Sequence, residues 1–392
     1  MLKVWNMSLV VITFFLTIFG TFMTRSGVVQ SVHAFGEDRA LAWMFTVFMG
    51  AVLLFSFGWL IYRLPMLKPR YDMDSWISRE AAFVANNWIL LIAALLVLFG
   101  TMFPTITEAL TGNRLTVGPP FFNKWMTPIG LILLALTGIA QLLAWRRSTP
   151  ANLREQFLWP VVTAVAVSAA LVALGVRVWS SGICFALCAF VAATIAQEFV
   201  RGARVRKEAT ATDLLTATIG LVTRERRRYG GYIVHLGIVL MYLGFAGEGF
   251  KIDQQVLLKS GGQATVGHYT VRNMGVKVSD DGQKQMVTGH IAVSEDGKSL
   301  GYMYPARWFF RKHEEQPTTE VAIRRSVAED LYLVMPAYEL GDQSISLQIV
   351  INPLVNWIWT GFGLLVLGTG IALLPERAFA FALERAAASA TP

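Results

Sequence analysis

The chain has 392 residues, of which 54% are hydrophobic and only 15% are charged, and its mean hydropathy is +0.50. This composition excludes a water-soluble protein and indicates an integral membrane protein. The net charge of +8 gives no reason to expect nucleic acid as a partner, because the basic residues gather near the ends of apolar runs, as membrane topology requires.

Eight apolar runs are long enough to cross about 30 Å of hydrocarbon as helices of roughly 20 residues. They are Val4–Thr24, Leu41–Tyr62, Ala81–Met102, Trp125–Trp145, Phe157–Val176, Gly182–Val200, Gly231–Gly247 and Leu354–Leu374. The first run begins almost at Met1 and is too long for a signal peptide, so we expect it to remain as a membrane anchor. The sequence thus predicts a mainly α-helical, polytopic membrane protein.

Orientation follows from the loops, because cationic segments are retained on the cytoplasmic side of a membrane. Most Lys and Arg lie in alternate loops and near both termini. The intervening short loops hold few basic residues: Arg25, Arg39, Arg114, Lys124 and Arg177. We therefore predict that both termini are cytoplasmic.

The loop after the first run, residues 25–40, contains His33. If this loop is helical, its apolar side chains form one stripe: Val28, Val29, Val32 and Phe35. Such a helix suits the outer membrane interface, with His33 beside the stripe. His33 then either faces water or reaches a planar apolar ligand on the membrane, where Arg25 is placed to pair with a carboxylate such as a haem propionate.

The two cysteines, Cys184 and Cys188, lie four residues apart in one predicted helix. They share a helix face but cannot readily close a disulfide in regular helix geometry. We interpret them as small packing residues and predict no thiol chemistry.

His235 lies inside the seventh apolar run, where an imidazole needs a reason to be present. A neutral imidazole can satisfy one nitrogen with a hydrogen bond and offer the other to a metal, including haem iron. A histidine hydrogen-bonded to a neighbouring helix is the alternative. His235 follows the Arg226–Arg228 cluster by about seven residues, or roughly 10 Å, which places it nearer the cytoplasmic face than His33. We therefore expect that the two histidines do not share one iron.

Between the last two runs, Glu248 to Val350 is polar and strand-like, so it predicts a small antiparallel β-sandwich or barrel outside the membrane. The expected strands are Thr265–Val278, Gln285–Val293, Val321–Arg325, Leu331–Met335 and Ser344–Ile351, with a turn at Glu295–Lys298. The chain is accordingly divided into residues 1–247, 248–350 and 351–392.

Three histidines fall in this polar segment, namely His268, His290 and His313. They lack the spacing of metal ligands, and we interpret each as a surface or turn histidine. No nucleophile with a matching base is apparent, so no catalytic side chain is predicted.

Four motifs, in the same order, resemble the CcmF family, the membrane haem lyases of cytochrome c maturation. They are Lys3–Val28 with Ser31–Phe35, Arg226–His235, Pro317–Ile323 with Asp330–Tyr332, and Asn352–Trp359. The resemblance runs from Lys3 to about Glu376 and leaves an alanine-rich tail. The tryptophan-rich motif of the family and the part before it do not occur in this sequence. We interpret the chain as the later half of a split protein, with a fragment starting at an internal methionine as the alternative.

The resemblance implies a subunit of an enzyme that accepts haem on the periplasmic side and joins it to the CxxCH thiols of apocytochrome c. It implies His33 as an axial ligand of the incoming, transient substrate haem. It implies His235 as an axial ligand of a haem b within the membrane that reduces the incoming iron. Since each haem needs two axial ligands, the second ones are expected from the missing upstream part or another chain.

The implied partners are the upstream CcmF half, the haem chaperone CcmE, apocytochrome c and a CcmH-type thiol protein, with quinol as electron donor. The implied location is a bacterial cytoplasmic (inner) membrane, with an organellar inner membrane as the alternative. A lyase dedicated to CxxCK sites is not distinguished from one for CxxCH. Outside the family, a multi-pass transporter and a non-catalytic assembly scaffold stay open, although no internal repeat or pair of broken helices favours a transporter.

Overall fold

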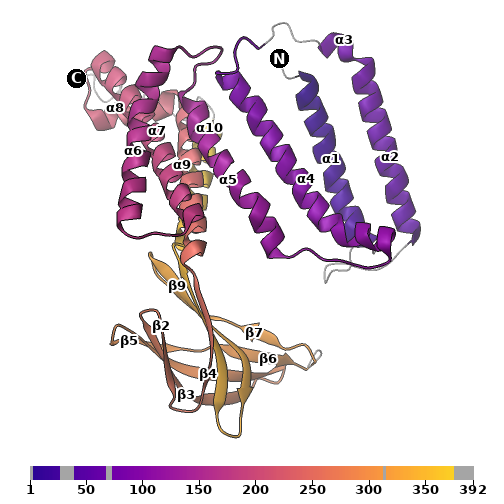
Figure 1. The fold of residues 1–392 in the computed structure, drawn as a ribbon, viewed down its shortest axis with the longest axis vertical. Coiled ribbons are helices and arrows are strands. Elements are labelled where there is room, and N and C mark those ends of the chain that lie inside the picture. The colour runs from indigo at the N-terminus through magenta and orange to yellow at the C-terminus, as the bar shows by residue number, and fades with distance from the viewer. Residues whose placement is uncertain (1–2, 27–38, 68–72, 312–314, 375–392) are drawn as a thin grey trace, which may run out of the picture. The chain divides into compact units, whose positions relative to one another are not determined.

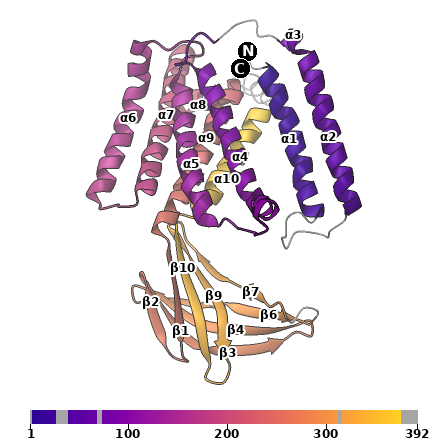
Figure 2. The same ribbon diagram turned by 45° about the vertical axis from the view of Figure 1, so that its right-hand side comes forward.

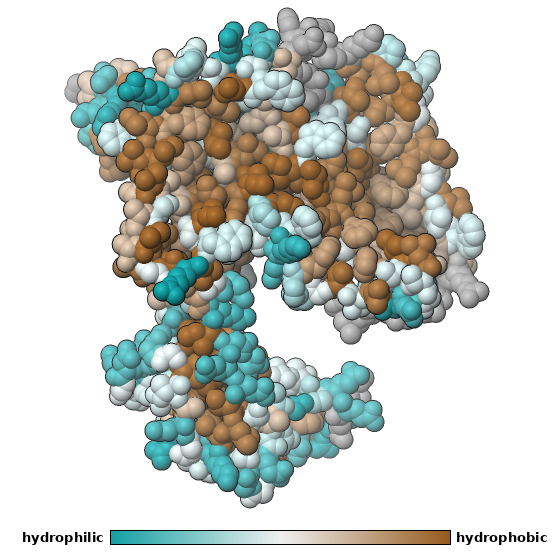
Figure 3. All heavy atoms as spheres, viewed as in Figure 1, coloured by the Kyte–Doolittle hydropathy of each residue, from teal (hydrophilic) through white to brown (hydrophobic). Residues whose placement is uncertain are grey.

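The computed structural model describes residues 3–26, 39–67, 73–311 and 315–374, which belong to two compact units, Met1–Glu155 and Gln156–Pro392 (Figure 1). Among these residues, eight helices are long and apolar enough to cross a membrane. Figure 3 shows apolar side chains over the outer surfaces of the helices and a mostly polar surface on the β domain. The predicted polytopic helical architecture with an antiparallel β domain is confirmed.

The first unit contains four long helices and one short one. They are α1 (Lys3–Arg25), α2 (Arg39–Tyr62), α3 (Leu64–Leu67), α4 (Arg79–Thr111) and α5 (Pro119–Leu142). The Ser78 side chain caps α4 by accepting from the Ala81 N–H. At the other end α4 runs well past the expected Met102 and stops at Gly112, whose φ of 74° is left-handed. The predicted end was too early because polar residues beyond an apolar run can continue a helix.

The second unit holds the remaining helices. They are α7 (Trp179–Thr210), α8 (Leu214–Arg224), α9 (Arg226–Ala246), the 3-10 turn η1 (Gly247–Phe250) and α10 (Asn356–Leu373), while α6 (Pro150–Ala173) begins at the boundary between the units. The helix α7 continues beyond the expected Val200, and α8 was not predicted. Asp213 caps α8 by accepting from the Leu215 and Thr216 N–H groups. Hydrogen bonds from Thr216 hold the pKa of Asp213 below its usual value.

Helices α9 and α10 pack backbone against backbone. Gly230, Gly237 and Gly244 recur every seven residues on one face of α9, and added Cβ atoms there would meet α10. At Gly237 a Cβ would lie 2.6 Å from the Gly361 carbonyl oxygen and 2.8 Å from the Leu365 nitrogen. Small residues permit such close approach, which supplies much of the packing energy between helices in lipid.

The β domain lies between α9 and α10 in the sequence and forms a two-sheet sandwich (Figure 2). Its strands are β1 (Ile252–Leu258), β2 (Gln263–Val266), β3 (Tyr269–Asp280), β4 (Lys284–Glu295), β5 (Lys298–Met303), β6 (Ala306–Phe310), β7 (Thr318–Glu320), β8 (Ala322–Arg325), β9 (Glu329–Glu339) and β10 (Ser344–Pro353). One sheet has the order β1-β10-β9-β8, and the other has β2-β3-β4-β6-β7 with β5 paired to β4. All the pairings are antiparallel.

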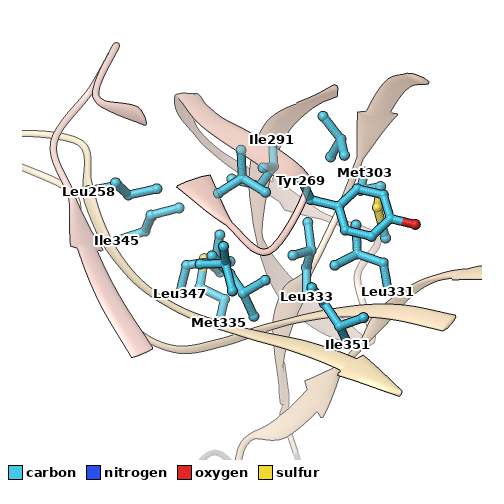
Figure 4. Packing of buried hydrophobic residues seen from close by; sticks show 14 of the residues in the cluster. Leu258, Tyr269, Ile291, Met303, Leu331, Leu333, Met335, Ile345, Leu347 and Ile351 are labelled. Carbon is cyan, nitrogen blue, oxygen red and sulfur yellow. The ribbon is translucent and has the colours of Figure 1, made fainter. Parts of the chain in front are cut away.

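The core of the sandwich is formed by alternating residues of both sheets (Figure 4). Leu333 and Leu347 from one sheet and Ile291 from the other are completely buried. Each such side chain contributes roughly 1.5–3 kcal/mol of hydrophobic stabilisation. The expected Thr265–Val278 strand is interrupted, because Gly267 has a φ of +60° and turns the chain between β2 and β3. The turn predicted at Glu295–Lys298 is confirmed as the β4–β5 hairpin.

The last strand leads directly into α10. Asn356, the first residue of that helix, donates from Nδ2 to the Ser326 carbonyl oxygen and to Oδ1 of Asp330. Asp330 is only 2% exposed, so this bond satisfies a buried carboxylate. The β domain is therefore tied to α10, and through the glycine contacts to α9.

Candidate functional site

The contact between α7 and α9 fixes the helix that carries His235. Ser181 donates from Oγ to the Ala246 carbonyl oxygen at 2.8 Å. One and two turns after Ser181 on α7, the thiols of Cys184 and Cys188 lie 3.4 Å from the Tyr242 carbonyl oxygen and 3.5 Å from the Val239 carbonyl oxygen, respectively. Both cysteines are free and buried, and they act as the small packing residues that the sequence predicted.

His235 is half-buried beside this contact. At 100° per residue it points roughly 160° away from Gly237, so the imidazole faces away from α10. Arg228 and Tyr242 stand seven residues on either side and share its face. One turn before His235, a Cβ added to Gly231 would meet nothing within 4 Å. The helix surface at Gly231 is therefore open, whereas the opposite face of α9 is closely packed against α10.

A buried ionic cluster holds the Arg226 end of α9 against α7. Glu198 of α7 is 2% exposed, and its Oε2 accepts from Nη2 of Arg228 at 2.7 Å and from the Tyr232 hydroxyl at 3.0 Å. Its Oε1 pairs with Nη2 of Arg201, which also donates from Nη1 to Oε1 of Gln156 at 2.8 Å. We call these five residues the Glu198 cluster.

Sequence reasoning missed this cluster, although a signal was present. Glu198 is a single carboxylate inside an apolar run, and such a residue nearly always has a partner. Its partner Arg228 lies among the arginines at the start of α9. Spacing within one helix does not reveal such a pair, because the partners lie 30 residues apart.

The other candidate residues belong to other segments of the chain. His33 and His313 fall outside the described residues, and Arg25 is the exposed last residue of α1. His290 lies in β4 with its ring 5.1 Å from that of Tyr304. Within the described ranges, no group of three or more His, Cys, Asp or Glu side chains is placed to hold a metal ion.

His268 occupies the β2–β3 turn, where its Nε2 lies 2.6 Å from Oε1 of Glu329 and 3.7 Å from Oε1 of Glu295. The neighbouring Tyr269 is buried. Burial is the main cause that raises the pKa of its phenol, and its hydrogen bond with the Glu329 carboxylate raises the pKa further. Glu329 is the first residue of β9 and pairs with Pro353, the last residue of β10, so this histidine lies near the strand end that leads into α10.

The fold and the histidine helix define a polytopic membrane protein with an attached antiparallel β-sandwich. Residues 249–353 match a family model described as the CcmF C-terminal beta-sandwich. Over 96% of its length the chain is similar to curated cytochrome c-type biogenesis proteins of the CcmF family. It spans about half the length of the curated relatives it matches.

Three relatives illustrate the similarity. The chain is 30% identical over 383 residues to the cytochrome c-type biogenesis protein CcmF of Pseudomonas aeruginosa, covering 96% of this chain and 56% of that protein. It is 31% identical to CycK of Rhizobium meliloti, with 96% and 55% covered, and 28% identical to CcmF of Escherichia coli, with 96% and 56% covered. A solved structure, named Cytochrome c Heme Lyase CcmF, superposes with a TM-score of 0.72 at 24% identity over 95% of this chain and 55% of that one, which shows a shared fold.

Proposed function

We propose that this chain is part of a cytochrome c haem lyase and that His235 supplies an axial ligand to a haem b held among the helices. The observation that carries this assignment is the position of the imidazole. It lies on a membrane-spanning helix, half-buried, next to open surface at Gly231. An iron ligand needs such access for one ring nitrogen, so the residues present fit the group.

When bound, haem b supplies one-electron chemistry that keeps the incoming haem iron reduced. The chain itself holds the ligand in place. Contacts from Ser181, Cys184 and Cys188 fix α9 after His235, and the Glu198 cluster fixes it before His235. The imidazole therefore projects from a helix that is tied to α7 on both sides, which is the rigid support that a ligand site requires.

In the proposed reaction, each cysteine thiol of the apocytochrome adds across a vinyl group of the substrate haem. A carbon–sulfur bond forms at one vinyl carbon and the proton goes to the other carbon, so the addition consumes no oxidant. We assign His33 as an axial ligand of this substrate haem and Arg25 as a residue that pairs with a propionate. The second ligand of each iron comes from the upstream CcmF half or another chain.

This proposal includes cytoplasmic termini, and it places the β domain on the periplasmic side of a bacterial inner membrane. The β domain is then available to the haem chaperone CcmE, to apocytochrome c and to a CcmH-type thiol partner, with quinol as the electron donor. The division into residues 1–247, 248–350 and 351–392 follows from the same topology.

The test is co-expression of the chain with an upstream CcmF half in a strain that lacks this activity. We expect covalent haem to appear on a reporter c-type cytochrome with a CxxCH site. A strain that matures the reporter fully without this chain, but loses uptake of a solute, would refute the proposal in favour of a transporter. Maturation that persists when both His33 and His235 are replaced by Ala would indicate an assembly scaffold instead.

A further inference from the structure

Arg228 shares the face of α9 that carries His235. The two residues are seven positions apart, which is nearly two helical turns and about 10 Å along the axis. The guanidinium donates from Nε to the Tyr232 hydroxyl at 3.2 Å and from Nη2 to Glu198 at 2.7 Å. Within the described part of the chain its Nη1 makes no hydrogen bond, and half of the side chain is exposed. Two N–H donors therefore remain available for an anion on this face.

The charges of the Glu198 cluster do not balance. Glu198 carries one negative charge, whereas Arg201 and Arg228 carry two positive charges. Arg201 uses both of its Nη atoms, on Glu198 and on Gln156. A further carboxylate at Nη1 of Arg228 would bring the formal charge of the cluster to zero.

The helix surface between Arg228 and His235 is open at Gly231. Gly231 lies between them on the same face, and a Cβ there would meet nothing within 4 Å. The adjacent Gly230 is different, because a Cβ there would lie 2.8 Å from the Gly368 carbonyl oxygen of α10. Helix packing therefore explains the glycine at 230 but not the one at 231. A glycine without a packing role is suited to the close approach of a ligand.

We infer that Arg228 and Gly231 form a subsite that orients the porphyrin ligated at His235. The macrocycle lies along α9 over Gly231, and one of its carboxylates pairs with Nη1 of Arg228. The basic residues decide toward which end of α9 the carboxylates point. No Lys or Arg follows His235 on α9, and the next basic residue, Lys251, already pairs with Glu248 at 3.5 Å, so the carboxylates point toward Arg228. This inference rests on the proposed function and adds the recognition of the cofactor's carboxylates to it.

The experiment compares two porphyrins on the purified complex of this chain with its upstream half, after removal of haem. The complex is titrated with haem and with haem dimethyl ester, and binding is followed by the Soret absorbance. A charge-assisted hydrogen bond predicts a preference of about tenfold or more for the free acid. We expect Arg228→Gln to abolish this preference, which is read as the ratio of the two affinities measured on the same variant.

Tyr232→Phe is the matched control, because it removes the other α9 bond to Glu198 and keeps the guanidinium. It should retain the preference for the free acid. Arg228→Lys is the second variant, for use if Arg228→Gln does not fold. It keeps a positive charge beside Glu198 but lacks the planar guanidinium, so we expect its preference for the free acid to be smaller than that of the parent. Gly231→Leu should weaken the binding of both porphyrins. The inference is refuted if both Arg228 variants prefer the free acid as strongly as the parent does.

The same titration separates failure of this subsite from failure of the proposed function. His235→Ala should lose the spectrum of an imidazole-ligated iron with either porphyrin. If His235→Ala behaves like the parent, the ligand assignment is wrong, and the acid-to-ester ratio of the Arg228 variants still decides the subsite. A parent complex that binds neither porphyrin refutes both proposals.

Discussion

Replacing Gly368 with Ala should push α10 slightly away from α9 and destabilise the packing of the two helices. A Cβ at this position would lie 2.7 Å from the Val234 nitrogen and 2.8 Å from the Gly230 carbonyl oxygen, both of which are backbone atoms. Ordinary contact begins at 3.4 Å, so the helices must move apart by about 0.7 Å. Overpacking of this kind costs about 1–3 kcal/mol.

Gly370 provides the matched control on the same helix, because a Cβ there would meet nothing within 4 Å. Both Gly→Ala changes gain about 1 kcal/mol of helix propensity, so the difference between the variants isolates the packing cost. The free energy of unfolding would be measured in detergent micelles for the parent, Gly368→Ala and Gly370→Ala. We expect Gly370→Ala to match or exceed the parent and to exceed Gly368→Ala by about 1–3 kcal/mol. Equal stabilities for the two variants would refute the backbone-to-backbone packing of α9 and α10.

Three further predictions concern buried polar groups. Glu198→Ala should lower the unfolding free energy by about 1–3 kcal/mol, less than for fully buried pairs because its arginine partners are half-exposed, and an unchanged value would contradict the cluster. Asn356→Ala leaves the buried Asp330 without its donor and should destabilise the β domain by about 1–3 kcal/mol, visible as a lower thermal midpoint than that of the parent. The raised pKa of Tyr269 means that the folded domain holds its phenol proton where the unfolded chain releases it, so stability should be full below about pH 10 and fall as pH rises further. Tyr269→Phe should make this alkaline decline shallower, and an identical pH profile would argue against the assignment.

Much of the helical architecture could be predicted because lipid imposes a simple rule of length and hydropathy. Each predicted span corresponds to a helix of the structure. The errors fall where the rule ends. Helix α7 continues to Thr210 through basic residues, which lie outside the apolar run that predicted the helix. Helix α8 is too short to give an apolar run of membrane-spanning length.

The site was only partly predictable from the sequence. His235 was conspicuous because an imidazole contrasts with its apolar neighbours. Its surroundings depend on rotation of α9 between α7 and α10, which is set by glycines that look unremarkable in a membrane segment. The pairing of Glu198 with Arg228 likewise needs the packing of two separate helices, and Arg228 looks in the sequence like an ordinary topology signal.

The central claim is that His235 ligates haem iron within the helix bundle. The most direct measurement is the haem content and the reduced visible spectrum of the purified complex with its upstream half, for the parent, His235→Ala and His290→Ala. We predict that His235→Ala loses the membrane haem or its low-spin bands, while His290→Ala, whose ring lies in β4 against Tyr304, matches the parent. Full haem content with an unchanged spectrum in His235→Ala would contradict the claim.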